Sequence, residues 1–236
     1  MEPNHGVTGK KPEPQDSKAW RFVVRLLAWA EGNPPQALLY REVRDPFQKL
    51  CLSILLQRAR PRQAEEACRR LFSVLPTVRD VAEAPKELIA ELVRPAGMQN
   101  LRAERLKALA NALIQGYGGK IPESREELLR LPGVGEYAAD LTLCWVFGRD
   151  VVVIDSNVLR ILRRVGLIRR DGEARRVLER IIPKRLRKSF NFILINFGGQ
   201  VCRPVRPRCR ECVLRDLCDH FNVEVRGASP PSPAHP

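Results

Sequence analysis

Four cysteines near the end of the chain have the type and spacing of a metal or cluster site. They follow the pattern C-x6-C-x2-C-x5-C within seventeen residues, as Cys202, Cys209, Cys212 and Cys218. Disulfides are one alternative, but the other three cysteines stand singly in apolar segments and no secretory signal is visible. Zinc is another, although structural zinc sites usually use two close pairs held some distance apart. The compact all-cysteine loop favours a [4Fe–4S] cluster.

A second candidate is the stretch Leu131-Pro132-Gly133-Val134-Gly135. Apolar residues recur at helical spacing directly after it, so we expect a tight turn that leads into a helix. The amides at a helix start are free and the helix dipole is positive there, which suits a phosphate. Leu131, Gly133, Val134 and Gly135 are therefore predicted to contact a nucleic-acid backbone. Taken alone, the glycines fit an ordinary turn equally well.

The charge distribution favours a polyanionic partner. The chain has a formal net charge of +14, and residues 158–188 hold twelve Arg or Lys against three acids, a net of +9. Five arginines lie in the cysteine loop: Arg203, Arg206, Arg208, Arg210 and Arg215. Arginine suits phosphates geometrically, and phosphate contacts release counterions. A solvated basic surface is the alternative interpretation.

The elements that position these residues read as an all-α chain. Asp45 and Pro46 open a segment that is apolar on nearly every face, which predicts a central buried helix. In the first helix, we expect an apolar stripe of Trp20, Val23, Val24, Leu27 and Ala30. Polar tails are expected to be disordered at 1–17 and 222–236. The sequence has no run of about 18 apolar residues, so it predicts no membrane span.

The order of these features resembles the endonuclease III superfamily, the helix–hairpin–helix DNA glycosylases with an iron–sulfur loop. The resemblance covers about Arg44 to Phe221 and rests on LPGVG, Asp155 twenty residues after Gly135, and the cysteine pattern. It implies two helical domains with the active site in a cleft between them. One is a six-helix barrel with the hairpin, at 43–150. The other carries the cluster and combines 18–42 with 151–221.

The branch of this superfamily is indicated by the residue two after the last hairpin glycine. In the bifunctional branch it is a lysine that forms an imine and cuts the strand. Here it is Tyr137, which cannot form one. The resemblance is closest to the mismatch glycosylases that remove thymine or uracil opposite guanine. Ser53 departs from that branch, as it does from adenine glycosylases, because both carry a glutamate at this position.

The resemblance assigns roles to five residues. Asp155 is the carboxylate that stabilises positive charge on the sugar and orients a water; a plain helix N-cap is the alternative. Tyr137 lines the pocket for a flipped base. Gln57 and Arg58 fill the space that the base leaves. Asn157 holds Asp155 or a phosphate.

The expected protein is a monofunctional DNA glycosylase that acts on double-stranded DNA with a mismatched or damaged base. It is expected to be a cytoplasmic, nucleoid-associated monomer. Alternatives within the enzyme class are an adenine glycosylase without its accessory domain and a glycosylase for a modified base. A non-catalytic DNA-binding module is a third possibility, and a redox-sensing role for the cluster a fourth.

Overall fold

The computed structural model describes residues 17–34 and 42–225, and within these ranges it is helical without a β-strand. The described residues also hold no helix long and apolar enough to cross a membrane. They form two compact units. We call 42–156 with 184–192 the hairpin unit, and 17–34 with 157–183 and 193–225 the cysteine unit. The prediction of an all-α chain is confirmed.

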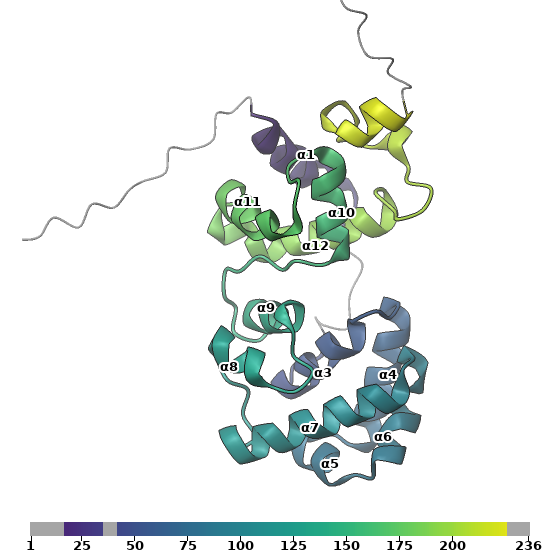
Figure 1. Ribbon diagram of the computed structural model, residues 1–236, viewed down its shortest axis with the longest axis vertical. Coiled ribbons are helices and arrows are strands. Elements are labelled where there is room, and N and C mark those ends of the chain that lie inside the picture. Colours follow the sequence, from purple (N-terminus) through teal and green to yellow (C-terminus); the bar gives the residue numbers. More distant parts are fainter. Residues whose placement is uncertain (1–16, 35–41, 226–236) are drawn as a thin grey trace, which may run out of the picture. The chain divides into compact units, whose positions relative to one another are not determined.

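The hairpin unit is built around one buried helix, α3 (Pro46–Leu56). Its side chains from Leu50 to Leu55 are all buried, as the sequence predicts. Helix α3 packs against α4 and α9, while α7 packs against α5 and α6 (Figure 1). The remaining elements are α4 (Pro61–Val74), α5 (Val78–Glu83), α6 (Lys86–Val93), η1 (Arg94–Ala96), α7 (Gln99–Tyr117), α8 (Arg125–Arg130) and α9 (Glu136–Trp145).

Local sequence signals start several of these helices. Asp45 accepts a hydrogen bond from the Gln48 amide at 2.9 Å, and Pro46 occupies the first turn, where its missing N–H is not needed. Thr77 and Asp80 form a reciprocal capping box before α5. Ser124 caps α8 by accepting from the Glu127 amide. These caps fix where α8 begins, and so where the hairpin that follows it must lie.

The cysteine unit gathers α1 with the C-terminal helices and the cysteine loop. The Trp29 ring of α1 meets the Phe197 ring of α12 edge-on, with centroids 5.1 Å apart. Arg25 of α1 bonds Asp216 and donates to the Val213 carbonyl at 3.0 Å, which ties α1 to the cysteine loop. The elements are α1 (Lys18–Gly32), α10 (Ser156–Val165), η2 (Asp171–Glu173), α11 (Ala174–Ile181), α12 (Arg187–Gln200), η4 (Cys209–Glu211), η5 (Arg215–Leu217) and η6 (Phe221–Val225). Helices α10 and α12 each begin in the hairpin unit, to which η3 (Lys184–Leu186) belongs entirely.

The stripe predicted for the first helix is mostly wrong, because of its five residues Val23 alone is buried. The buried side chains of α1 are Ala19, Phe22, Val23 and Leu26, whereas Trp20 and Val24 are 37% and 43% exposed. Both sets recur at helical spacing. The aromatic Phe22 and the neighbouring Leu26 are fully enclosed by the cysteine unit, and that rotates the helix away from the predicted face.

Two segments fall in a different unit from the predicted domain boundaries. Residues 151–156 and 184–192 group with the hairpin unit. The Asn191 carboxamide explains this, because its oxygen accepts from the Val153 amide at 3.1 Å and its nitrogen donates to the Val151 carbonyl. Of the predicted tails, Ser17 caps α1 and 222–225 belong to η6. The predictions for 1–16 and 226–236 lie outside the described residues.

Candidate active site

The hairpin between α8 and α9 presents backbone rather than side chains. Leu131 and Val134 are buried in the core of the hairpin unit, and the Val134 amide donates to the Leu131 carbonyl at 3.1 Å. Gly135 is the N-cap of α9 and brings no side chain to its first amides. Within the described structure no other side chain caps them. The hairpin thus offers free N–H groups at a positive helix end, the arrangement that binds a phosphate.

Gly133 is required by the shape of this turn. Its φ is +77°, a region that residues with a Cβ rarely adopt, and a Cβ there would lie 3.2 Å from Cβ of Arg105. Its carbonyl accepts from Gln57 Nε2 at 3.4 Å, which connects the hairpin to the end of α3. Two of the residues predicted to contact nucleic acid therefore meet in the structure.

The two helices of the motif are joined by a buried charge. Asp140 of α9 is only 1% exposed, and it accepts from Nε of Arg125 in α8 at 2.9 Å. This hydrogen bond raises the pKa of Arg125, with smaller contributions from the charges of Asp140 and Glu136. A buried carboxylate needs such a partner, since an unpaired one is strongly destabilising. The pair fixes the angle at which the hairpin is held.

Replacing Gly133 with alanine tests whether the hairpin binds phosphate; we call this function the phosphate grip. The left-handed conformation costs a residue with a Cβ about 1–2 kcal/mol, and Arg105 is in the way. We expect affinity for any duplex to fall about tenfold, regardless of sequence, in titrations at fixed salt. Gly116→Ala is the control, because a Cβ at that helical position meets nothing within 4 Å. Unchanged affinity in Gly133→Ala would contradict this role.

Tyr137 and Asp155 interact in the hairpin unit. Burial raises the pKa of Tyr137, and the negative charge of Asp155 raises it further. The phenol therefore stays protonated and neutral near neutral pH. Tyr137 is the second residue of α9, while Asp155 directly precedes α10 and is half-buried. The two residues predicted to be catalytic are thus within electrostatic reach of each other.

Gln57 and Arg58 lie where α3 ends and line one cavity of about 250 Å³. Two further lining residues, Met98 and Leu101, are large apolar side chains that are 45% and 41% exposed. Arg58 and Met98 both adopt left-handed backbone conformations, with φ of 56° and 49°. Polar and apolar side chains of this kind can enter a duplex and occupy a vacated space.

Asn157 is enclosed by its own unit. Its Oδ1 accepts from Arg160 at 2.6 Å. A Cβ on Gly198 would lie 2.8 Å from Cβ of Asn157, so α12 approaches Asn157 as closely as a glycine allows. Arg160 also donates to the carbonyls of Gly198 and Cys202. This packing suits a residue that fixes the start of α10 directly after Asp155.

Ser53, at the position where the resembling branches carry glutamate, supplies no acid. Its side chain is fully buried, and Oγ donates to the Leu50 carbonyl at 2.6 Å within α3. A hydroxyl in this bond is satisfied by the backbone of its own helix. The chain therefore offers no proton donor at this place.

The four cysteines of the loop lie within electrostatic reach of one another. Burial raises the pKa of the Cys212 thiol to about 12, and the charges of Cys202, Cys218 and Cys209 raise it too, so the four sulfurs are electrostatic neighbours. Sγ of Cys202 accepts from Arg164 at 3.6 Å, and Sγ of Cys212 accepts from the Leu214 amide at 3.4 Å. None of the seven cysteines, all of which lie in the described ranges, forms a disulfide, and three of them, Cys51, Cys68 and Cys144, are buried in the hairpin unit. Among the described residues, no three His, Cys, Asp or Glu side chains are grouped to hold a single metal ion.

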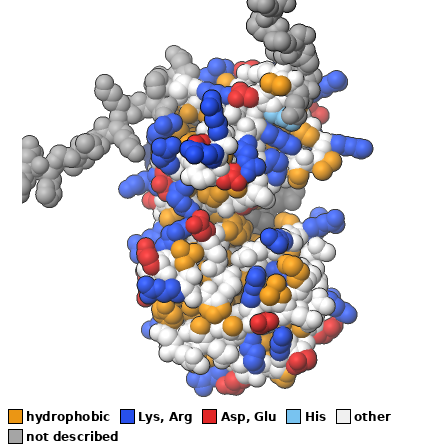
Figure 2. All heavy atoms as spheres, viewed as in Figure 1, with side chains coloured by type: hydrophobic (Ala, Val, Ile, Leu, Met, Phe, Trp, Pro, Cys, Tyr) orange, Lys and Arg blue, Asp and Glu red, His pale blue; other side chains and the backbone are white. Residues whose placement is uncertain are grey.

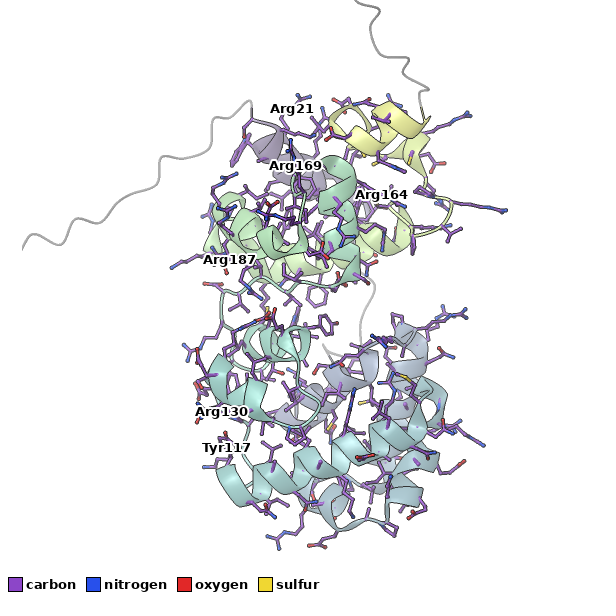
Figure 3. All side chains as sticks on the ribbon, viewed as in Figure 1. Arg21, Tyr117, Arg130, Arg164, Arg169 and Arg187 are labelled. Atoms are coloured by element: carbon purple, nitrogen blue, oxygen red, sulfur yellow. The ribbon has the colours of Figure 1, made fainter. Side chains whose placement is uncertain are left out.

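Basic side chains surround this loop. Figure 2 shows many Lys and Arg side chains on the helices of the cysteine unit. Arg164, labelled in Figure 3, lies on α10 and donates to the carbonyls of Arg203 and Pro204 at 2.7 and 3.1 Å. The loop is thus held by hydrogen bonds while its outer arginines remain available to phosphates.

Comparison with known proteins identifies the family to which this chain belongs. Residues 51–187 match the family described as HhH-GPD superfamily base excision DNA repair protein, and the match spans the hairpin, Tyr137 and Asp155. The chain belongs to the HhH-GPD superfamily. The resemblance expected from the sequence is therefore confirmed.

Relatives within the HhH-GPD superfamily carry two kinds of name. The chain is 35% identical to "Endonuclease III" of Thermotoga maritima, over 78% of this chain and 87% of the relative. It is 31% identical to "Thymine/uracil-DNA glycosylase" of Methanothermobacter thermautotrophicus, over 77% and 85%. Identity alone thus leaves the branch open.

Solved structures show the same fold. A non-covalent endonuclease III–DNA complex matches with a TM-score of 0.82 at 28% identity, covering 88% of this chain and 98% of that one. A thermostable thymine-DNA glycosylase matches with a TM-score of 0.80 at 28% identity, covering 89% and 100%. The predicted helix–hairpin–helix glycosylase fold is confirmed.

Three residues of this HhH-GPD chain were missed by the sequence reasoning. Met98 lies beside Gln57 and Arg58, and an exposed methionine after a glycine could have drawn attention to it. Arg105 packs under Gly133. Arg130, labelled in Figure 3, ends α8 just before the hairpin, where a cation can join the phosphate grip.

Proposed function

We propose that this chain is a monofunctional DNA glycosylase of base excision repair, which hydrolyses the N-glycosidic bond of a flipped thymine or uracil mispaired with guanine. The observation that carries the proposal is the pair of Tyr137 and Asp155. Burial keeps Tyr137 a neutral phenol within electrostatic reach of the Asp155 carboxylate. The place that a lyase fills with an amine is taken by a group that forms no imine.

Asp155 performs the central step. Breaking the bond to the base leaves positive charge on the sugar, and a fixed carboxylate stabilises that charge and orients the attacking water. Tyr137 forms a wall of the base pocket. The free amides of the hairpin hold the phosphate backbone while the nucleotide is turned out of the stack.

Ser53 weighs against an adenine substrate. Adenine needs a proton to become a good leaving group, and the buried hydroxyl of Ser53 supplies none. The mismatch branch also carries a glutamate at this position, so the preference for thymine or uracil rests on Tyr137 and not on position 53. A pyrimidine opposite guanine is also less costly to extrude than a paired base. The names of the archaeal relatives, such as "Thymine-DNA glycosylase" of Aeropyrum pernix at 32% identity, agree with this substrate.

A duplex panel tests the proposal. Duplexes with one G·T, G·U, G·A, oxidised-pyrimidine or alkylated-base site are incubated with the protein and scored with and without alkali. Release from G·T and G·U, visible only after alkaline cleavage, is expected. Strand cuts without alkali at oxidised pyrimidines would instead contradict the monofunctional assignment. Tight mismatch binding without release of any base would support a non-catalytic module.

We further propose that Cys202, Cys209, Cys212 and Cys218 hold a [4Fe–4S] cluster. Four thiols that form no disulfide and lie within electrostatic reach of one another fit it, and sulfur acceptors of N–H bonds are usual around such clusters. The cluster would supply a rigid cross-link for the loop that carries the five arginines. The loop residues would then present their cations to the backbone of double-stranded DNA.

Elemental analysis tests the cluster. Protein purified without oxygen is expected to contain about four irons and four sulfides per chain, with visible absorbance. Cys212→Ser should lose most of both, because it removes one of four ligands. Cys68→Ala, at a buried thiol of α4, should keep them. One zinc per chain without sulfide would refute the assignment.

A further inference from the structure

Arg102 of α7 is a buried cation whose bonds go to backbone carbonyls. The side chain belongs to a residue only 3% exposed. Nε donates to Gly97 O at 2.8 Å, Nη1 to Ile54 O at 2.9 Å, and Nη2 to Gln57 O at 2.7 Å and Ala96 O at 3.3 Å. Among the described residues, no carboxylate forms an ion pair with it. Burying a charge without a carboxylate partner costs free energy, and here the hydrogen bonds to the four carbonyls offset that cost.

The carbonyls come from two separate segments. Ile54 and Gln57 end α3, while Ala96 and Gly97 end the turn before α7. The residue that follows each segment, Arg58 or Met98, is exposed in a left-handed conformation. Such conformations persist only where the surroundings impose them. Arg102 is bonded to the residue just before each one.

Arg102 also acts on the hairpin indirectly. The Gln57 carbonyl is held by Arg102, and the Gln57 side chain donates to the Gly133 carbonyl. Gly133 in turn lies against Arg105, one turn further along α7. Residues of the single helix α7 therefore contact both carbonyl segments, through Arg102, and the hairpin turn, through Arg105.

We propose that Arg102 is a positioning residue that fixes Gln57–Arg58 and Met98 as one rigid pair of probes, which enters the duplex when a base is flipped. This inference rests on the proposed function. The planar guanidinium reaches carbonyls in several directions at once, whereas the three donors of a lysine radiate from one nitrogen. Lysine at this position keeps the positive charge but cannot donate to the carbonyls of both segments at once, which is the bridge that Arg102 forms.

Fluorescence of 2-aminopurine placed beside a G·T mismatch measures this role directly, because unstacking raises its emission. We expect Arg102→Lys to bind the duplex within about threefold of the unchanged protein, since phosphate contacts remain. The fluorescence rise at saturation should fall at least about fivefold, because misplaced probes no longer open the stack. Ile89→Val is the matched control for lost stability, as Ile89 is buried in α6 and is not among the residues that line the cavity of Gln57 and Arg58.

A double-variant cycle separates positioning from general structure. If Arg102 acts through the probes, adding Arg102→Lys to Met98→Ala should cause little further loss of fluorescence. Fully additive losses, or a full fluorescence rise in Arg102→Lys, would overturn the inference. If Arg102→Lys does not fold, Gly97→Ala carries the same expectation, because its φ of +72° and ψ of 171° strain any Cβ at the other end of the bridge. Failure of the unchanged protein to release thymine or uracil would refute the proposed function and leave this measurement intact.

Discussion

Asp155→Asn lowers the rate of base release from G·T and G·U duplexes about a thousandfold, and leaves duplex affinity almost unchanged. The amide keeps the shape of the side chain and removes the charge that stabilises the sugar cation and orients the water. Tyr137 loses the influence of that charge, but burial, the larger cause of its raised pKa, remains and keeps the phenol neutral. Single-turnover release with alkaline cleavage, together with binding titrations, measures both quantities.

Asp150→Asn is the matched control for this experiment. Asp150 is an exposed carboxylate of the same unit, five residues earlier, and only its backbone carbonyl is engaged by Arg187. Its loss should leave release unchanged. If Asp155→Asn released base as fast as the unchanged protein, or lost binding in parallel with release, Asp155 would be a structural cap and the mechanism proposed above would be wrong.

Tyr137→Lys should introduce strand cleavage that needs no alkali, together with a covalent DNA adduct trapped by borohydride. The new amine would occupy the place of a phenol whose pKa is raised first by burial and then by Asp155. For a lysine these two causes have opposite signs: burial lowers its pKa and the carboxylate raises it. Because burial is the larger cause for Tyr137, we expect a free amine fraction well above that of an exposed lysine.

The pH dependence of the adduct yield checks this reasoning. Trapping should rise as pH increases through the pKa of the new amine, and its midpoint should lie below the ordinary lysine value near 10.4. Tyr137→Phe is the control, since it keeps the ring and offers no nucleophile. An adduct formed by the unchanged protein would contradict the monofunctional assignment, and a Tyr137→Lys protein that releases base without cutting would place the amine out of reach.

Much of the fold follows from local signals in the sequence. The Asp45–Pro46 start and the continuous apolar run predict the buried α3, because such a run has no face to give to water. The two glycines and the helical spacing after them predict the hairpin. The α1 stripe failed because periodicity identifies candidate faces and does not say which face the rest of the unit covers. Phe22 and Trp20 satisfied the same spacing, and only packing chose Phe22.

The candidate site shows the same division. Types and spacing pointed to Tyr137, Asp155 and the four cysteines, and the structure brings each set within electrostatic reach. The bridge made by Arg102 was invisible, because its acceptors are backbone carbonyls, which every residue has. Met98 was equally hidden, since nothing in the sequence marks a left-handed backbone at a residue other than glycine.

The seven thiols of the chain differ in how far they are enclosed. Cys51, Cys68 and Cys144 lie in the core of the hairpin unit and are at most 1% exposed, whereas Cys202, Cys209 and Cys212 of the loop are half-buried. A reagent in solution reaches a half-buried thiol without opening the fold, and it reaches a core thiol only after local unfolding. Iron and sulfide would therefore be taken up at the loop, and peroxide should modify the loop cysteines first in a folded chain that lacks the cluster.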